Sequence, residues 1–248
     1  MKKPYTKKEY APKTLFPMRI NKYLASKGYG TRRGADELIE RRQVFINGRP
    51  AVVGDKIQKT DTIEVRMRGA PKEYVYVAYN KPAGIITPSA QRAEKDTTNV
   101  FKGAALPEGL FPLGRLDKES HGLMILTNDG RLTDRLLNPD YGHEKEYVVR
   151  TTNKIRPSFK QHMEAGVDIG GYTTKPCVIH IRNDMEFTIT LTEGKKHQIR
   201  RMCAALHNDV TDLKRIRIMN IMLGSLAKNA WRPIAGPELA HFLKSIGL

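Results

Sequence analysis

Near the start of the chain, hydrophobic residues recur at the spacing of helices. Apolar side chains within 20–24 and within 35–39 fall on one side of a helical turn, which predicts two short helices. Gly28 and Gly30 separate these segments, and the Thr31 hydroxyl can cap the second helix. We therefore expect a pair of helices at the beginning of the fold.

The pattern changes to that of strands directly afterwards. Segments 44–46 and 51–53 are apolar and flank the dipeptide Asn47-Gly48, a strong signal for a hairpin turn. Residues 62–67 alternate between apolar and polar side chains. Two helices followed by a few short strands predict a small separate module.

Beyond residue 73 the chain has the pattern of many strands with few helices between them. Alternating or wholly apolar stretches bounded by turn residues predict the strands, and apolar residues at helical spacing predict the helices. The expected strands are 74–79, 123–127, 145–149, 178–181, 187–191 and 216–223, and the expected helices are 132–137, 157–165 and 198–206. This mixture predicts an α+β fold with a mixed, mainly antiparallel sheet.

Composition divides the chain into three parts. Residues 1–17 are rich in lysine, contain three prolines and show no periodicity, so we expect a disordered basic arm that either touches RNA or has no role. Residues 18–72 form the small module, and residues 73–248 form the larger domain. The 248 residues are enough for two domains that each bury a core.

Positive charge is in large excess and concentrated in the first part of the chain. Lysine and arginine total 43 against 26 acidic residues, a net charge of +17, and residues 1–72 hold +11 of it (18 basic minus 7 acidic). Such an excess predicts a nucleic acid as partner. A membrane surface is not expected, because the sequence has no basic amphipathic helix and no lipidation motif. The apolar runs are too short to cross a bilayer and the N-terminus lacks the apolar core of a signal peptide, so we expect a cytoplasmic protein.

Two arginines, Arg32 and Arg33, follow Thr31 at the start of the second expected helix. Cations at this end oppose the helix dipole, and a bound phosphate would remove the conflict. A solvated basic face is the alternative, and for a lone pair of arginines it would be preferred. The surplus of charge around them favours RNA contact, for which the candidate residues are Arg19, Lys22, Arg32, Arg33, Arg41 and Arg42.

The strongest candidate for chemistry is the segment Gly114–Leu123, with the sequence GRLDKESHGL. It places Asp117 between two basic residues, directly before an apolar strand. A lone aspartate beside a turn is more often a cap or part of a surface ion pair than a catalyst. The segment resembles the active-site motif of the pseudouridine synthases, in which GRLD is followed by a hydroxyl residue, glycine and leucine. The resemblance implies that Asp117 is the nucleophile or base that starts cleavage of the uridine glycosidic bond, and that Arg115 fills the space left by the flipped base.

A second segment, EGKKHQIRRM at 193–202, resembles a later motif of the same family. The resemblance implies that Arg200 pairs with Asp117 and keeps it ionised, since a nearby arginine lowers a carboxylate pKa. Tyr147 matches the tyrosine on which the flipped uracil stacks. Lys195 departs from the Arg or Asn of many relatives, a change that keeps or adds positive charge. RNA contacts are expected from Lys195, Lys196, His197, Gln198 and Arg201.

Residues 18–66 resemble an S4 RNA-binding domain through the pattern of their helices and hairpin. An S4 domain followed by this catalytic domain resembles the branch of the family that acts on ribosomal RNA. Within it, segments 144–147 and 215–220 resemble the synthases of the large subunit. The resemblance implies a cofactor-free isomerase, expected as a monomer, whose partner is ribosomal RNA presented as a structured stem-loop with the target uridine flipped.

Other functions remain open from the residues alone. Asp117 with Glu119 would suit a glycoside hydrolase acting on RNA nucleosides, which admits water to its site. A non-catalytic RNA-binding factor for ribosome assembly would show the same S4 pattern and charge. No histidine or cysteine spacing fits a metal site, and the two distant cysteines, Cys177 and Cys203, do not suggest a disulfide framework, so no metal is expected.

Overall fold

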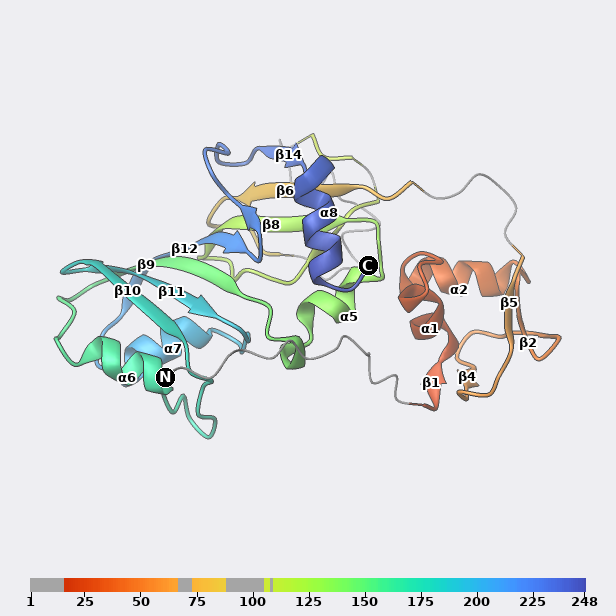
Figure 1. Cartoon of the computed structure of the whole chain (residues 1–248), viewed down its shortest axis with the longest axis horizontal. Coiled ribbons are helices and arrows are strands. Elements are labelled where there is room, and N and C mark those ends of the chain that lie inside the picture. Colours follow the sequence, from red (N-terminus) through yellow and green to blue (C-terminus); the bar gives the residue numbers. More distant parts are fainter. Residues whose placement is uncertain (1–15, 67–72, 88–104, 108) are drawn as a thin grey trace.

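The computed structural model describes residues 16–66, 73–87, 105–107 and 109–248 (Figure 1). Most of the expected basic arm, residues 1–15, lies outside the described residues. The remainder forms a small N-terminal module and a larger domain built on one sheet.

The N-terminal module packs two helices against short strands. Thr31 caps the second helix, because its Oγ1 accepts a hydrogen bond from the Gly34 amide at 3.1 Å. Ile20, Leu24 and Ala35 point inward and are fully buried, so the expected helical faces are confirmed. The elements are β1 (Met18–Arg19), α1 (Ile20–Ser26), α2 (Arg32–Glu40), β2 (Val44–Ile46), β3 (Arg49–Pro50), β4 (Lys56–Ile57) and β5 (Ile63–Val65).

The expected hairpin forms, but its second arm is shorter than predicted. Asn47 and Gly48 both have positive φ angles, and Ile46 pairs with Arg49 immediately after them. The prediction of a strand over 51–53 is wrong, since β3 ends at Pro50. The carboxylate of Asp55 accepts a hydrogen bond from the Val52 amide and turns the chain there, which leaves the Val52 side chain exposed.

The larger domain is a sheet with the strand order β10-β11-β9-β12-β8-β6-β14, to which β7 adds beside β8 and β13 beside β12. Its pairs are antiparallel except for β12 and β8, which run parallel, so the predicted mixed, mainly antiparallel α+β fold is confirmed. The strands are β6 (Tyr76–Lys81), β7 (Phe111–Leu113), β8 (His121–Thr127), β9 (Lys145–Thr151), β10 (Val178–Asn183), β11 (Glu186–Leu191), β12 (Val210–Ile218), β13 (Ile221–Met222) and β14 (Trp231–Pro233).

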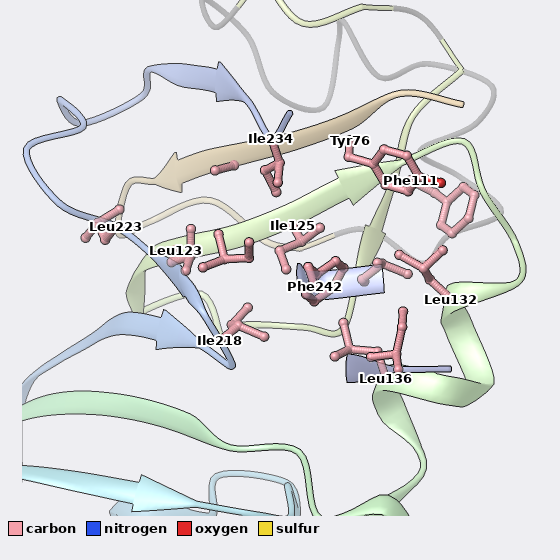
Figure 2. Packing of buried hydrophobic residues seen from close by; sticks show 14 residues of the cluster. Tyr76, Phe111, Leu123, Ile125, Leu132, Leu136, Ile218, Leu223, Ile234 and Phe242 are labelled. Atoms are coloured by element: carbon pink, nitrogen blue, oxygen red, sulfur yellow. The ribbon is translucent and has the colours of Figure 1, made fainter. Parts of the chain in front are cut away.

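Helices cover both faces of this sheet. One core cluster joins Leu123 and Ile125 of β8 to α5 and α8, with Phe242 fully buried at its centre (Figure 2). A second cluster joins Val149 and Leu213 to α6 and α7. The helices are α5 (Leu132–Leu137), the 3-10 helix η1 (Pro139–Tyr141), α6 (Phe159–Ala165), α7 (Gln198–Ala205) and α8 (Gly236–Ser245).

The last long strand predicted, 216–223, is wrong as a single element. The chain turns at Met219 and Asn220, and Ile218 pairs with Ile221 across that turn. Met219 has a φ of 52°, a left-handed conformation that periodicity does not reveal in a methionine. Side chains alternate in the same way along two paired strands as along one long strand. The sequence pattern therefore could not distinguish a hairpin from a single strand here.

Candidate active site

Asp117 lies in the loop between β7 and β8, and a buried lysine holds this loop from beneath. Lys81, at the end of β6, is fully buried. Its ammonium donates to the carbonyl oxygens of Ser120 at 2.7 Å, Pro82 at 2.9 Å and Lys118 at 3.5 Å. Two of these carbonyls belong to the residues that follow Asp117, so Lys81 fixes the loop on the carboxyl side of the aspartate.

Burial lowers the pKa of the Lys81 ammonium to about 8. The carboxylates of Glu119 and Asp117 oppose this shift, and the guanidinium of Arg215 adds to it. Lys81 and Arg215 are therefore two cations in the electrostatic neighbourhood of the aspartate loop.

A second set of hydrogen bonds fixes the backbone immediately before and immediately after Asp117. The Thr87 hydroxyl donates to the Leu116 carbonyl at 2.7 Å and accepts from the Leu116 amide at 3.1 Å. The Gly84 amide donates to the Lys118 carbonyl at 2.8 Å. The backbone on each side of Asp117 is thus held, and the carboxylate is presented from a fixed position.

The second motif folds into a turn that is organised by a buried carboxylate. Glu193 accepts hydrogen bonds from the Tyr172 hydroxyl at 2.6 Å, the Gln198 side chain at 2.8 Å and the Lys175 amide at 2.9 Å. Burial by itself would raise the pKa of Glu193, but these hydrogen bonds outweigh it and lower the pKa. Gln198 also accepts from the Lys195 amide at 2.9 Å and thereby closes the turn.

The turn brings His197 to Asp117. His197 stands at the N-cap of α7 with a left-handed φ of 52°. Its Nδ1 lies 3.0 Å from Oδ2 of Asp117, and the two side chains are 44% and 38% exposed. The two sequence motifs, far apart along the chain, therefore meet at one contact that solvent and a ligand can reach.

The expected pair between Arg200 and Asp117 is wrong for this structure. Arg200 projects from α7 toward β12, and its Nη1 donates to the Val210 carbonyl at 2.9 Å. His197, three residues earlier, takes the place beside the aspartate. Residues three apart on a helix share a face, so the motif alone could not decide which of them reaches Asp117. The sequence predicts His197 only as an RNA contact.

Tyr147 lies on β9, in the middle of the sheet. It packs against the core cluster beside α6 and α7 and also against a third cluster, which includes Leu116 of the aspartate loop. Tyr147 and the aspartate loop thus share one core cluster, and the role of the ring stays a prediction. Burial lowers the pKa of Lys145, two residues earlier on the same face, to about 8, and the charge of Arg215 adds to this shift.

Sequence reasoning missed Arg215, which reaches the loop from β12. Its side chain is 2% exposed, and its Nε donates to the Leu123 carbonyl at 2.6 Å while Nη1 lies 3.5 Å from the Arg115 carbonyl. The segment 215–220 had been noted only as a mark of family resemblance. Its neighbour Gly122 carried a signal, because glycine in a core strand indicates close approach of another backbone.

The predicted RNA-contact residues separate into exposed and engaged side chains. The prediction that Gln198 contacts RNA is wrong, because its side chain is buried. Its amide donates to Glu193 and accepts from the Lys195 backbone amide. Arg201 is exposed, with its guanidinium donating to the Ile169 carbonyl. Lys195 stacks on the Tyr172 ring at 4.2 Å and is also exposed. The other exposed candidates are Arg19, Lys22, Arg32, Arg33, Arg41, Arg42, Arg115, Lys196 and His197.

Within the described residues, no group of three or more histidine, cysteine or acidic side chains is arranged to hold a metal ion. In the same part of the chain, no helix is both long and apolar enough to cross a membrane. Cys177 and Cys203 are free thiols, and burial raises the pKa of each to about 12.

Comparison with known proteins agrees with this geometry. Residues 75–205 match the family model described as RNA pseudouridylate synthase, and residues 18–63 match the S4 domain. The chain belongs to the RNA pseudouridine synthase family. Its members are isomerases, so the non-catalytic and hydrolytic alternatives lose their support.

Several curated relatives cover nearly the whole chain. The dual-specificity RNA pseudouridine synthase RluF of Salmonella typhi is 40% identical over 232 residues, which are 92% of this chain and 79% of the relative. An uncharacterized RNA pseudouridine synthase of Bacillus subtilis is 36% identical, covering 91% and 98%. Ribosomal small subunit pseudouridine synthase A of Pasteurella multocida is 32% identical, covering 92% and 100%. The predicted likeness to the S4-containing branch, and to RluF within it, is confirmed.

A solved structure supports the fold. The crystal structure of a pseudouridylate synthase superposes with a TM-score of 0.64 at 28% identity, covering 92% of this chain and 99% of that one. Its coverage includes both the small module and the sheet domain of this protein.

Proposed function

We propose that the protein isomerises specific uridines of ribosomal RNA, in the large subunit, to pseudouridine without a cofactor. The observation that carries this proposal is the meeting of the two motifs at the Asp117–His197 contact, on a loop fixed from both sides. Relatives of this chain bear names for different RNA targets, so the choice of the large subunit rests on the resemblance of segment 215–220.

In this proposal Asp117 is the nucleophile or base that starts cleavage of the glycosidic bond, and the uracil stacks on Tyr147. This proposal is supported by the partial exposure of the Asp117 carboxylate, which a base flipped out of its helix can reach, and by the cluster that Tyr147 shares with Leu116. Arg115, exposed next to Asp117, fills the space that the base vacates. A closed pocket keeps water from the detached uracil until it rejoins the ribose through C5.

We propose that Arg200 pairs with Asp117 only once RNA is bound. In this proposal Arg200 turns from the Val210 carbonyl, to which its Nη1 donates, toward Asp117 while His197 leaves the carboxylate. Entry of a uridine beside Asp117 would displace the exposed imidazole and allow that exchange.

The proposed division of labour follows the predicted domains. Residues 18–72, with the arm 1–17, bind RNA phosphates through their arginines and lysines, and residues 73–248 carry the reaction. We further propose that the protein acts as a monomer in the cytoplasm on a structured stem-loop.

The test is to incubate purified protein with ribosomal RNA transcripts and map pseudouridine by nuclease digestion and mass spectrometry. Appearance of pseudouridine at discrete positions of the large-subunit transcript is the expected result. Modification confined to the small-subunit transcript would contradict the proposed target, and release of free uracil would contradict the isomerisation.

Replacement of Tyr147 by leucine is expected to slow isomerisation by roughly 5- to 150-fold, the kinetic equivalent of the ~1–3 kcal/mol that base stacking contributes. Tyr147→Phe keeps the ring and should retain most of the activity. Single-turnover rates of Tyr147→Leu and Tyr147→Phe test whether the aromatic ring is needed. Thermal unfolding confirms that both variants fold. Equal losses in the two variants would indicate that the hydroxyl matters and the ring face does not.

Neutralising Arg32 and Arg33 with glutamine is expected to weaken RNA binding and make it less sensitive to salt. Each phosphate contact releases counterions, so the slope of log affinity against log salt should become shallower by about 1 to 2. Binding isotherms at several salt concentrations measure this slope.

The matched control replaces Arg49 and Arg66 of the same module with glutamine. It removes the same two positive charges. Both are paired with carboxylates, Arg49 with Asp55 at 2.8 Å and Arg66 with Glu64 at 2.9 Å. A slope that changes as much in this control would show that net charge, and no local contact, governs binding.

A further inference from the structure

Arg215 is a buried cation beside the aspartate loop. It belongs to neither of the two family motifs, Gly114–Leu123 and 193–202. Its Nε and Nη1 face the carbonyls of Leu123 and Arg115, but Nη2 is buried with no hydrogen-bond partner. Four side chains in the described part of the chain have such an unpaired buried atom, and two of them, Ser120 and Arg215, border the Asp117 loop. Unpaired donors are therefore concentrated at the site.

The sheet places Arg215 beside the predicted base-stacking ring. Arg215 on β12 is paired with Tyr147 on β9, and side chains of directly opposed residues lie on the same face. On its other side Arg215 pairs with Gly122, where an added Cβ would lie 2.3 Å from the Arg215 carbonyl oxygen. Glycine at 122 thus permits β12 to approach the loop closely enough for the guanidinium to pass beneath it.

No acidic side chain in the described residues forms an ion pair with Arg215. Two further cations share its surroundings, because the charge of Arg215 lowers the pKa values of Lys81 and Lys145. A buried guanidinium without a counter-ion is costly, and such a group is retained where a ligand of opposite charge compensates it. The cluster is suited to negative charge that develops during the reaction.

The family reaction produces such a charge. When the C1′–N1 bond breaks, its electron pair leaves with the base, so the detached uracil is an anion with charge shared between N1 and the carbonyl oxygens. The ribose is left short of an electron pair at C1′, which Asp117 supplies either by bonding to C1′ or by removing the C2′ proton. When the new C1′–C5 bond forms, the bond to Asp117 breaks or the C2′ proton is returned, the C5 proton departs and N1 takes up a proton, which restores neutrality. Donors fixed in advance where charge appears lower the barrier most.

We propose that Arg215 is a catalytic residue whose Nη2 donates to a carbonyl oxygen of the detached uracil and stabilises its negative charge. This inference rests on the proposed stacking of the base on Tyr147, which sets the uracil next to the guanidinium. Lys81 and Lys145 strengthen the positive potential without contacting the base.

The experiment compares the wild-type protein with Arg215→Met on two RNAs that carry uridine or 5-fluorouridine at the target. Fluorine withdraws electrons and stabilises the uracil anion, so it reduces the need for Arg215. Single-turnover loss of the target nucleoside should fall by about 10²- to 10³-fold for uridine and by far less for 5-fluorouridine, with little change in RNA affinity. Arg215→Lys should recover part of the rate.

The ratio of the two rates is independent of how much of the variant is folded, so misfolding cannot imitate the expected result. Equal losses on the two RNAs would assign Arg215 a structural role and overturn the proposal. Arg217→Met, two residues along β12 and paired with Glu144 and Glu146, is the control and should keep the wild-type rates. Failure of the proposed function would look different, because the wild-type protein itself would form no pseudouridine.

Discussion

Asp117→Asn is expected to abolish pseudouridine formation while the protein stays folded and bound to RNA. The amide has the shape of the carboxylate but can neither attack the nucleotide nor take a proton from it. Loss of such a group slows an enzyme by about 10⁴-fold or more. The Asp117 side chain contributes one half-exposed contact, to His197, so the fold should not depend on it. Mass spectrometry of digested RNA and a binding isotherm on the same preparation measure both results.

Glu119→Gln is the matched control for this prediction, because Glu119 is an exposed carboxylate two residues away in the same loop. We expect near wild-type turnover from it. A loss comparable to that of Asp117→Asn, together with release of free uracil by the wild-type protein, would support the two-carboxylate hydrolase instead. Turnover of Asp117→Asn at the wild-type rate would remove Asp117 from the mechanism altogether.

Lys81→Met is expected to reduce both stability and activity, since the ammonium holds the aspartate loop through three carbonyls. Leaving buried acceptors unsatisfied costs ~1–3 kcal/mol each, and relief of the buried charge offsets part of it, so we expect a net loss of about 2–4 kcal/mol in the free energy of unfolding. The turnover number should fall more than RNA affinity, because the loop carries Asp117, the proposed catalytic group. Denaturant unfolding and single-turnover kinetics separate the two effects.

The stability difference should also depend on pH. The folded-state pKa of Lys81 is lowered from 10.5 to about 8, so between these values the unfolded chain binds the proton and the folded protein does not. Stability of the wild type therefore rises with pH across this window relative to Lys81→Met, and the gap widens from pH 8 toward pH 10. Lys118→Met is the control, because the Lys118 side chain is exposed and Lys81 bonds only to the Lys118 backbone carbonyl. If the difference in unfolding free energy between the wild type and Lys81→Met became smaller from pH 8 to pH 10, the lowered pKa of the buried Lys81 would be contradicted.

Features set by neighbouring residues could be predicted from the sequence. The Thr31 cap, the Asn47-Gly48 turn and the helix Leu132–Leu137 each depend on side chains within a few positions of one another, and each forms as expected. The GRLD motif identified Asp117 in the same way, because residue types at fixed spacing carry the chemistry of the loop. Periodicity failed at Met219, where a left-handed turn interrupts an unbroken alternation.

The sequence by itself determined the order of the S4 and synthase domains, the strand-rich α+β fold, the excess of basic residues and the position of the GRLD motif that holds Asp117. Only the tertiary structure decided which side chains surround that aspartate. His197 replaces Arg200 beside it because the helix start orients one and turns the other toward β12. Arg215 enters the site because β12 pairs in parallel with β8 at Gly122, a pairing between residues remote in the chain. Local patterns reveal which residue types are present, but the distance between remote side chains depends on how the strands pair and pack.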